Sequence, residues 1–121
     1  MNIEDFRDYC LSLPGATEKM PFQQFHAGNT TLVFYVNDKT FCYTDIDNFE
    51  SCMIKGDPET IENLRERFRC VDNPSHFGNK HWMTIYVNED MDDEMLKDLI
   101  RQSYEIVSAQ SQKKVKKKKN C

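Results

Sequence analysis

Apolar residues recur at helical spacing near both ends of the chain and in one stretch between them. The first predicted helix is marked by four such residues: Ile3, Phe6, Cys10 and Leu13. Asn2 is suited to the N-cap, because its side-chain oxygen can accept a free N–H of the first turn. The sequence Pro14-Gly15 ends the helix, since proline cannot continue the hydrogen-bond ladder and glycine permits a turn.

The other two predicted helices carry their own start signals. Asp57 fits an N-cap and Pro58 the first helical position, and the buried side of this helix is expected to hold Ile61, Leu64 and Phe68. The last helix is predicted to start in the acidic cluster 90–94, where carboxylates favour the positive end of the helix dipole. Its expected buried stripe is Met95, Leu96, Leu99, Ile100, Ser103, Ile106 and Val107.

Between the helices, β-branched and aromatic residues predict strands. The segments 31–36 and 40–44 form a hairpin around Asn37-Asp38, and 49–54 is a further strand. The segment 81–87 alternates, with Trp82, Thr84 and Tyr86 on one side and Met83, Ile85 and Val87 on the other. The segment 18–26 is expected to be extended, with Pro21 favouring a sheet edge, and 72–80 to be a loop.

This order of elements predicts one α+β domain. Clustered strands with helices at the ends and in one insertion indicate a two-layer sandwich, with an antiparallel sheet and helices packed on one face. The 121 residues suffice for a single core. We expect the domain to cover residues 1–110 and a lysine-rich flexible tail to cover residues 111–121.

Charge is divided unequally between the predicted domain and the tail. The formal net charge is −4, but 113–119 reads KKVKKKK and contains six lysines. Without them, ten basic residues face 20 acidic ones, so residues 1–112 carry about −10. The lysines are Lys113, Lys114, Lys116, Lys117, Lys118 and Lys119. Such a run is either a solvated, flexible end or a contact for nucleic acid or another polyanion.

The sequence predicts a cytoplasmic protein with free thiols. No apolar run is long enough to cross a membrane, and the acidic start lacks the pattern of a signal peptide. The five cysteines are odd in number and form no C-x-x-C pair. Cys10, Cys42 and Cys52 lie in apolar patterns and are expected to be core residues, whereas Cys121 follows the lysine run.

Enzyme signatures are missing from the sequence, so a non-enzymatic protein without cofactor or metal is expected. The chain has four glycines and no phosphate-binding, dinucleotide-binding or metalloprotease motif. The spacing of His76 and His81 fits no common zinc site. A Cys70–His76 nucleophile pair needs only spatial proximity, but Cys70 lies in a run that looks buried.

The densest group of functional side chains spans 76–82 and contains His76, Asn79, Lys80, His81 and Trp82. These residue types bind phosphates and stack on bases. The structural alternative is that Trp82 belongs to the core while the polar residues shape a turn. For the binding reading, Arg65, Arg67 and Arg69 are expected to extend the group into a basic patch beside the lysine tail.

Ordered motifs over nearly the whole chain except the tail resemble those of the MmcQ/YjbR family of small bacterial proteins. The matching segments are Leu13-Pro14-Gly15-Ala16-Thr17-Glu18-Lys19-x-Pro21-Phe22, Lys55-x-Asp57-Pro58-Glu59, Leu64-Arg65, His76-x-x-Asn79-Lys80-His81-Trp82-x-Thr84 and Ser103-Tyr104-x-Ile106-Val107. The resemblance implies a CyaY-like two-layer fold and a family commonly labelled DNA-binding, by analogy to a double-wing domain. It supplies no catalytic residues. In this chain Gln23 and Asp38 stand where the resemblance leads us to expect glycine.

Two functions of different class remain open from the sequence. In the first, the protein binds DNA or RNA through the 76–82 region and the lysine tail. In the second, it is an acidic protein-interaction or chaperone-like module that meets a basic partner. A monomer is favoured in both, with no membrane partner.

Overall fold

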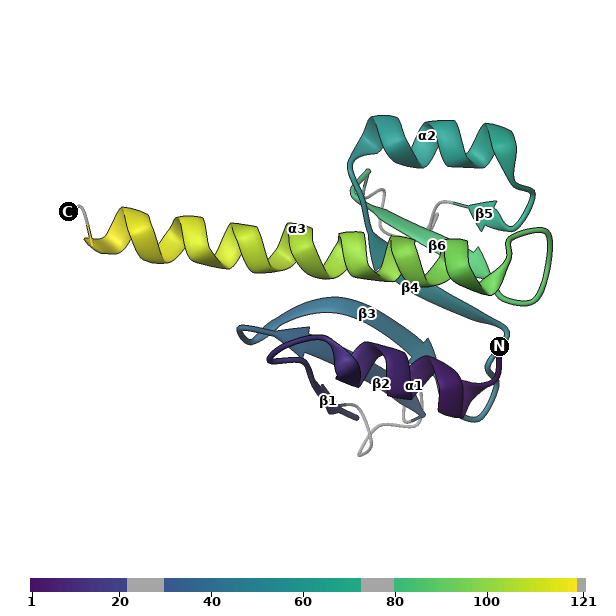
Figure 1. The fold of residues 1–121 in the computed structure, drawn as a ribbon, viewed down its shortest axis with the longest axis horizontal. Helices are drawn as coiled ribbons and strands as arrows, with labels where there is room; N and C mark the ends of the chain where they lie inside the picture. Colours follow the sequence, from purple (N-terminus) through teal and green to yellow (C-terminus); the bar gives the residue numbers. More distant parts are fainter. Residues whose placement is uncertain (22–29, 73–79, 120–121) are drawn as a thin grey trace.

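The structure, a computed structural model, describes residues 1–21, 30–72 and 80–119, with side chains as far as residue 110. The elements in chain order are α1 (Ile3–Ser12), β1 (Thr17–Lys19), β2 (Thr31–Val36), β3 (Lys39–Asp45), β4 (Ser51–Lys55), α2 (Pro58–Arg67), β5 (Val71–Asp72), β6 (Trp82–Tyr86) and α3 (Asp93–Lys119). The strands form one antiparallel sheet in the order β1-β2-β3-β4-β6-β5. Figure 1 shows α1 and α3 running across the sheet, with α2 near β5 and β6. The predicted α+β class is confirmed.

The core lies on one face of the sheet, beneath the helices. Cross-strand partners share a face, and the pairs Phe34–Cys42, Cys42–Ile54 and Ile54–Met83 form a buried row across four strands. The Phe6 ring of α1 meets the Phe34 ring at 5.8 Å between centroids. The three predicted core cysteines, Cys10, Cys42 and Cys52, are fully buried there.

A β-bulge in β3 is held by a hydroxyl from α3. The register between β2 and β3 shifts at Phe34/Tyr35, so that Phe41 is the extra residue of β3 and its ladder is interrupted. Ser103, which is fully buried, donates to the Phe41 carbonyl at 2.5 Å and accepts the Lys55 N–H at 2.8 Å. The Tyr104 hydroxyl donates to the Pro14 carbonyl. The Ser-Tyr motif therefore joins α3 to the rest of the fold.

The predicted helix starts are confirmed by their capping contacts. Asn2 accepts the Asp5 N–H at 2.8 Å, and Asp57 accepts the Glu59 N–H at 3.1 Å. Asp92, within the predicted acidic start, accepts the Met95 N–H at 2.8 Å. Each side-chain oxygen satisfies an N–H that has no partner within its own helix.

The hairpin turn is formed without glycine. Asn37 and Asp38 have φ angles of 52° and 62°, as the tight turn between β2 and β3 requires. Asn and Asp tolerate this left-handed region better than most residues, because their short side chains can bond to the local backbone. Asp38 can therefore stand where the family resemblance leads us to expect glycine.

Several sequence expectations differ from the structure in detail. Residue 72 was expected to begin a loop, but it belongs to the short strand β5, which pairs with β6. The first extended segment starts at Thr17, one residue earlier than predicted. β1 lies at the sheet edge, where Pro21 suggested it. Phe68, Met95 and Ile106 are half-buried, whereas the sequence pattern predicted that they are buried.

The backbone of α3 continues as a helix to Lys119 and extends beyond the sheet (Figure 1). The predicted division between domain and tail at residue 110 stays a prediction. No helix in the described part of the chain is long and apolar enough to cross a membrane.

Candidate functional site: the sheet face opposite the helices

Aromatic and cationic side chains gather on the sheet face that points away from the core. We call this surface the aromatic face, and its residues are Lys19, Tyr35, Tyr43, Met53, Lys55, Trp82, Thr84 and Tyr86. Alternation along the strands puts them opposite the buried row. Lys19 is exposed, Tyr86 keeps 43% of its surface accessible, and the others are half-buried.

The main cluster of the aromatic face is a contact among residues of three strands, in which Lys55 ends β4 and Trp82 begins β6. Lys55 in β4 pairs with Trp82 in β6, and its ammonium lies 5.8 Å from the Trp82 ring centroid. The Tyr43 ring in β3 lies 5.7 Å from the Trp82 ring, at an interplanar angle of 55°. Burial raises the pKa of the Tyr43 phenol, so this side chain is neutral at physiological pH. The site therefore joins two uncharged rings and one positive charge.

A second lysine–aromatic pair lies toward the opposite edge of the same face. Lys19 in β1 pairs with Val33, and its ammonium lies 5.8 Å from the ring centroid of Tyr35 in β2. Within the described ranges 1–21, 30–72 and 80–110, neither Lys19 nor Lys55 forms an ion pair with a carboxylate. Both charges thus remain available to an anionic ligand.

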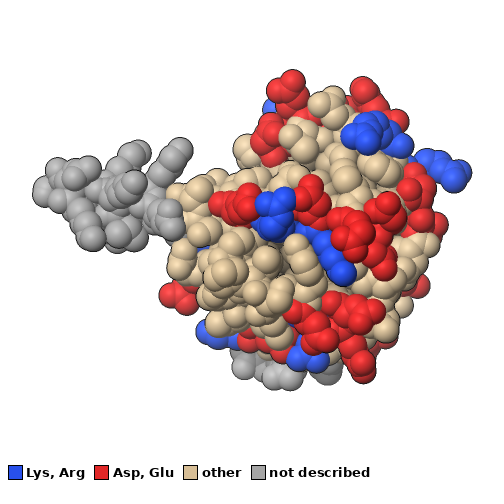
Figure 2. All heavy atoms as spheres, in the orientation of Figure 1, with Lys and Arg blue, Asp and Glu red and all other residues tan. Residues whose placement is uncertain are grey.

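Carboxylates are concentrated in the helices, unlike the lysines and rings of the aromatic face. As far as Gln110, acidic residues outnumber basic ones in each of the three helices. Figure 2 has the same orientation as Figure 1 and shows acidic side chains gathered on the helix side of the molecule. On the aromatic face the strand carboxylates are Asp45 and Asp72, each the last residue of its strand. Asp45 accepts Thr30 Oγ1 at 2.8 Å and two N–H groups of the next turn. These carboxylates therefore lie at the end of β3 and on the edge strand β5, where Asp72 pairs with Thr84, and none belongs to β4 or β6.

The predicted 76–82 group meets the aromatic face at Trp82. Lys80 and His81 are exposed just before β6, and the His81 carbonyl accepts the Gly56 N–H at 2.9 Å. This bond ties them to the connection between β4 and α2. The Asp57 carboxyl there has a lowered pKa, mainly through the Thr60 hydroxyl and with a smaller contribution from His81. His76 and Asn79 lie outside the described residues.

The three predicted arginines are not brought together with Lys80 and His81. They lie in the last turn of α2 or beyond it, whereas the His81 carbonyl bonds Gly56, two residues before the helix starts. A helix of 10 residues separates these ends by about 15 Å. Arg65 lies 3.7 Å from a Glu62 carboxylate oxygen, and the Arg67 guanidinium lies 5.3 Å from the Phe68 ring centroid. The expected single patch of arginines with Lys80 and His81 is therefore not formed.

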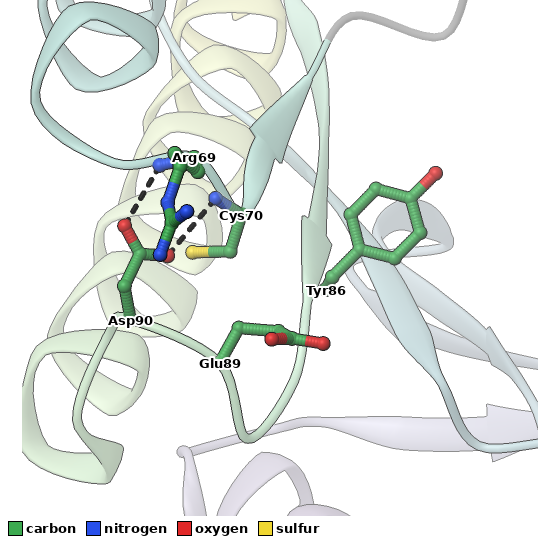
Figure 3. Close-up of a pocket in the computed structure, with 5 residues that line it drawn as sticks. All are labelled: Arg69, Cys70, Tyr86, Glu89 and Asp90. Carbon is green, nitrogen blue, oxygen red and sulfur yellow. Dashed lines mark hydrogen bonds between the residues drawn. The ribbon is translucent and has the colours of Figure 1, made fainter.

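Arg69 instead lines a pocket of about 400 Å³ with Cys70, Tyr86, Glu89 and Asp90. In Figure 3 the Asp90 carboxylate accepts the backbone N–H groups of Arg69 and Cys70, at 2.7 and 3.0 Å, while Tyr86 and Glu89 lie on the other side. Burial, followed by contact with Asp90, raises the pKa of the Cys70 thiol to about 11. The thiol is thus protonated at neutral pH and is a poor nucleophile. Its proposed partner His76 lies outside the described residues.

The basic end of α3 starts close to the contact between Lys55 and Trp82. Lys55 Nζ donates to Gln110 Oε1 at 3.3 Å. Lys113 follows three residues later, about 4.5 Å farther along the helix axis. The fold therefore places the first residues of the lysine segment near Lys55 and Trp82, although the sequence separates all three.

The sequence pattern did not predict most residues of the aromatic face. Lys19, Tyr35, Tyr43 and Lys55 are spread over four strands, and only the cross-strand register shows that they share a surface with Trp82. One signal was present, since tyrosine alternates with core residues in two adjacent predicted strands. No group of three or more His, Cys, Asp or Glu residues suited to a metal ion occurs among the residues whose placement is described.

Comparison with known proteins gives a consistent result. The family model YjbR matches residues 11–106. The chain is 27% identical over 106 residues to Escherichia coli K12 "Uncharacterized protein YjbR", covering 87% of this chain and 86% of that protein. A crystal structure of a Deinococcus radiodurans protein with a DUF419 domain superposes with a TM-score of 0.77 at 31% identity, covering 88% of this chain and 78% of the other.

A Pseudomonas syringae crystal structure shares the fold, with a TM-score of 0.71 at 22% identity over 88% of this chain and 99% of that one. The matches extend from α1 to α3 and agree with the motifs that first suggested the resemblance. The chain belongs to the YjbR family.

Proposed function

We propose that this protein binds nucleic acid, without catalysis, through the aromatic face of its sheet and the adjoining lysine segment 113–119. The observation that carries the proposal is the contact of Lys55 with Trp82, which pair across β4 and β6, two strands that contain no carboxylate. Lysine supplies a charge for phosphate, and the rings supply apolar surface for bases or sugars.

The separation of charge supports this proposal despite the acidic body. An evenly spread charge of about −10 would repel phosphates, but here acidic residues predominate in the helices, which lie on the other face. A phosphate near Lys55 would also be close to the start of the lysine segment. A cytoplasmic location would give such a site access to nucleic acid.

The acidic helices support a second candidate, in which they bind a basic protein partner. Carboxylates such as Glu4, Asp8 and Glu94 are exposed on that side. This candidate predicts that nucleic acid binding depends on the lysine segment alone. Both proposals can be tested with the same set of variants.

The test is fluorescence anisotropy of labelled DNA over a salt series of about 50–200 mM, comparing the full chain with a version that ends at Gln112. Lys55→Gln is the informative variant. Lys97→Gln is its matched control, because Lys97 also lies 5.8 Å from an aromatic centroid, that of Tyr9, but belongs to the helix layer. Both substitutions change the net charge equally, so a difference between them reports the position of the charge.

We expect the truncated protein to retain salt-dependent binding, and Lys55→Gln to weaken it while reducing the salt slope by about 0.7–0.9. Lys97→Gln should leave both the affinity and the slope unchanged. Equal effects of the two substitutions, or loss of all binding on truncation, would contradict the proposal. Loss of binding on truncation would favour the protein-partner candidate.

A further inference from the structure

We infer that Trp82 and Tyr43 form a stacking platform for unpaired bases, and that the ligand of the aromatic face is therefore single-stranded nucleic acid. This inference rests on the proposed function and specifies its ligand. It depends on ring geometry rather than on charge, so it can fail while nucleic acid binding itself stands.

The Tyr43 and Trp82 rings belong to β3 and β6 and meet over β4, the strand between these two. Tyr43 in β3 pairs with Met53 in β4, and Met53 pairs with Thr84 in β6, two residues from Trp82. The ring centroids of Tyr43 and Trp82 are 5.7 Å apart, with the planes tilted by 55°. The rings therefore do not cover each other as a parallel stack would, and each half-buried side chain keeps accessible surface.

Two lysines, each beside an aromatic ring, give this face a positive charge that complements the phosphates of a nucleic acid strand. Lys55 lies against Trp82 and Lys19 against Tyr35, each at 5.8 Å, on the same face. Trp82 and Tyr35 belong to strands separated by three strand spacings, or about 14 Å. At the rise of about 3.4 Å per stacked base, roughly four nucleotides cover this distance.

Duplex DNA cannot use this platform in the same way. Its bases are stacked on one another and present only their edges in the grooves, whereas unpaired bases offer their faces to aromatic side chains. Single-strand binding proteins combine a basic path for the backbone with aromatic side chains for successive bases. The aromatic face contains both components, and neither β4 nor β6, the strands of Lys55 and Trp82, contains a carboxylate.

Trp82 is the only tryptophan in the chain, so it reports directly on its own contacts. The experiment titrates the protein with a 12-nucleotide oligo(dT) and, separately, with a 12-base-pair duplex. It follows tryptophan emission together with the anisotropy of the labelled DNA. We expect the single strand to quench the emission with the same dissociation constant that anisotropy gives, and to bind more tightly than the duplex.

Three variants test the role of the rings. Trp82→Leu should weaken single-strand binding by about 5- to 160-fold, the range measured for loss of one base–aromatic stack. Trp82→Phe should restore most of the affinity, because phenylalanine keeps an aromatic face. Tyr9→Leu is the matched control, since Tyr9 is half-buried and lies beside Lys97 in the helix layer, and it should bind as the unmodified protein does. Circular dichroism checks that each variant is folded.

Each outcome bears on one proposal. Unchanged oligo(dT) affinity in Trp82→Leu, or binding without quenching of the tryptophan, would overturn the stacking inference and leave nucleic acid binding intact. Tighter binding of the duplex would do the same. Absence of binding to either DNA would overturn the proposed function itself. A low affinity of Trp82→Leu that Trp82→Phe restores would support the inference.

Discussion

The two faces of the sheet use the same strands for different purposes. Phe34 and Tyr35 are neighbours in β2, yet Phe34 is fully buried against α1 and β3, whereas Tyr35 is half-buried beside Lys19. The helix-covered face is apolar and closed, with acidic residues on the outer surface of the helices. The aromatic face combines rings with lysines. This difference shows how an acidic protein can keep lysines and rings together on one surface, because alternation along a strand separates the two environments.

The largest expected effect tests this contrast within a single strand. Phe34→Ala should lower the free energy of unfolding by about 3–5 kcal/mol, because it leaves a cavity in the core. Tyr35→Ala should lower it by only about 1 kcal/mol. Urea denaturation followed by circular dichroism measures both. If Phe34→Ala does not fold, Phe34→Leu provides a milder change at the same position. Equal losses for Phe34 and Tyr35 variants would mean that the two faces contribute alike to stability.

A smaller effect is expected where α3 joins the sheet. Ser103→Ala removes the hydroxyl that bonds the Phe41 carbonyl and the Lys55 N–H, leaving a backbone acceptor of the bulge and a strand N–H without that partner. The expected cost is about 1–3 kcal/mol of unfolding free energy.

The control for Ser103→Ala is Ser12→Ala, at an exposed serine that bonds the Tyr9 carbonyl on the surface, which should change stability by about 0.5 kcal/mol or less. Thermal unfolding of both variants makes the comparison. Similar melting temperatures for the two would show that the bridge between α3 and the bulge contributes little.

The smallest effect concerns the Asp90 carboxyl, which holds the start of β5 beside β6. Hydrogen bonds from the Arg69 N–H, the Cys70 thiol and the Cys70 N–H lower the pKa of Asp90. Because its folded-state pKa lies below the unfolded value of about 3.9, ionised Asp90 stabilises the fold at neutral pH, and this contribution is lost as the pH falls through the folded-state pKa. Asp90→Asn should therefore be less stable than the unmodified protein at neutral pH, with a gap that narrows in acid.

Urea midpoints measured between about pH 7 and about pH 3 test this pH dependence. Asp38→Asn, which removes one carboxylate from the exposed hairpin turn, controls for the change in net charge. A constant gap between Asp90→Asn and the unmodified protein over the whole range would contradict the role given to the Asp90 carboxylate.

Local patterns predicted the elements well because each depends on near neighbours. The caps at Asn2 and Asp57, the hairpin around Asn37-Asp38 and the alternation in β6 all follow from residues a few positions apart. Strand β5 was missed because two residues carry no usable periodicity, and it forms by pairing with β6. The predicted arginine patch is not formed for a different reason, since proximity in sequence to Lys80 and His81 did not imply proximity in space.

The sequence by itself determined the α+β class, the order of helices and strands, the core cysteines and the excess of acid before the lysine run. These properties are set by composition and by short-range periodicity. Only the tertiary structure decided which side chains share a surface: Lys55 contacts Trp82, Tyr43 reaches Trp82 across β4, and Gln110 bonds Lys55. Such neighbours depend on strand register and on the packing of α3 over the sheet. A shift of one residue in the strand register or in the position of α3 would move these side chains to the opposite face or to a different neighbour.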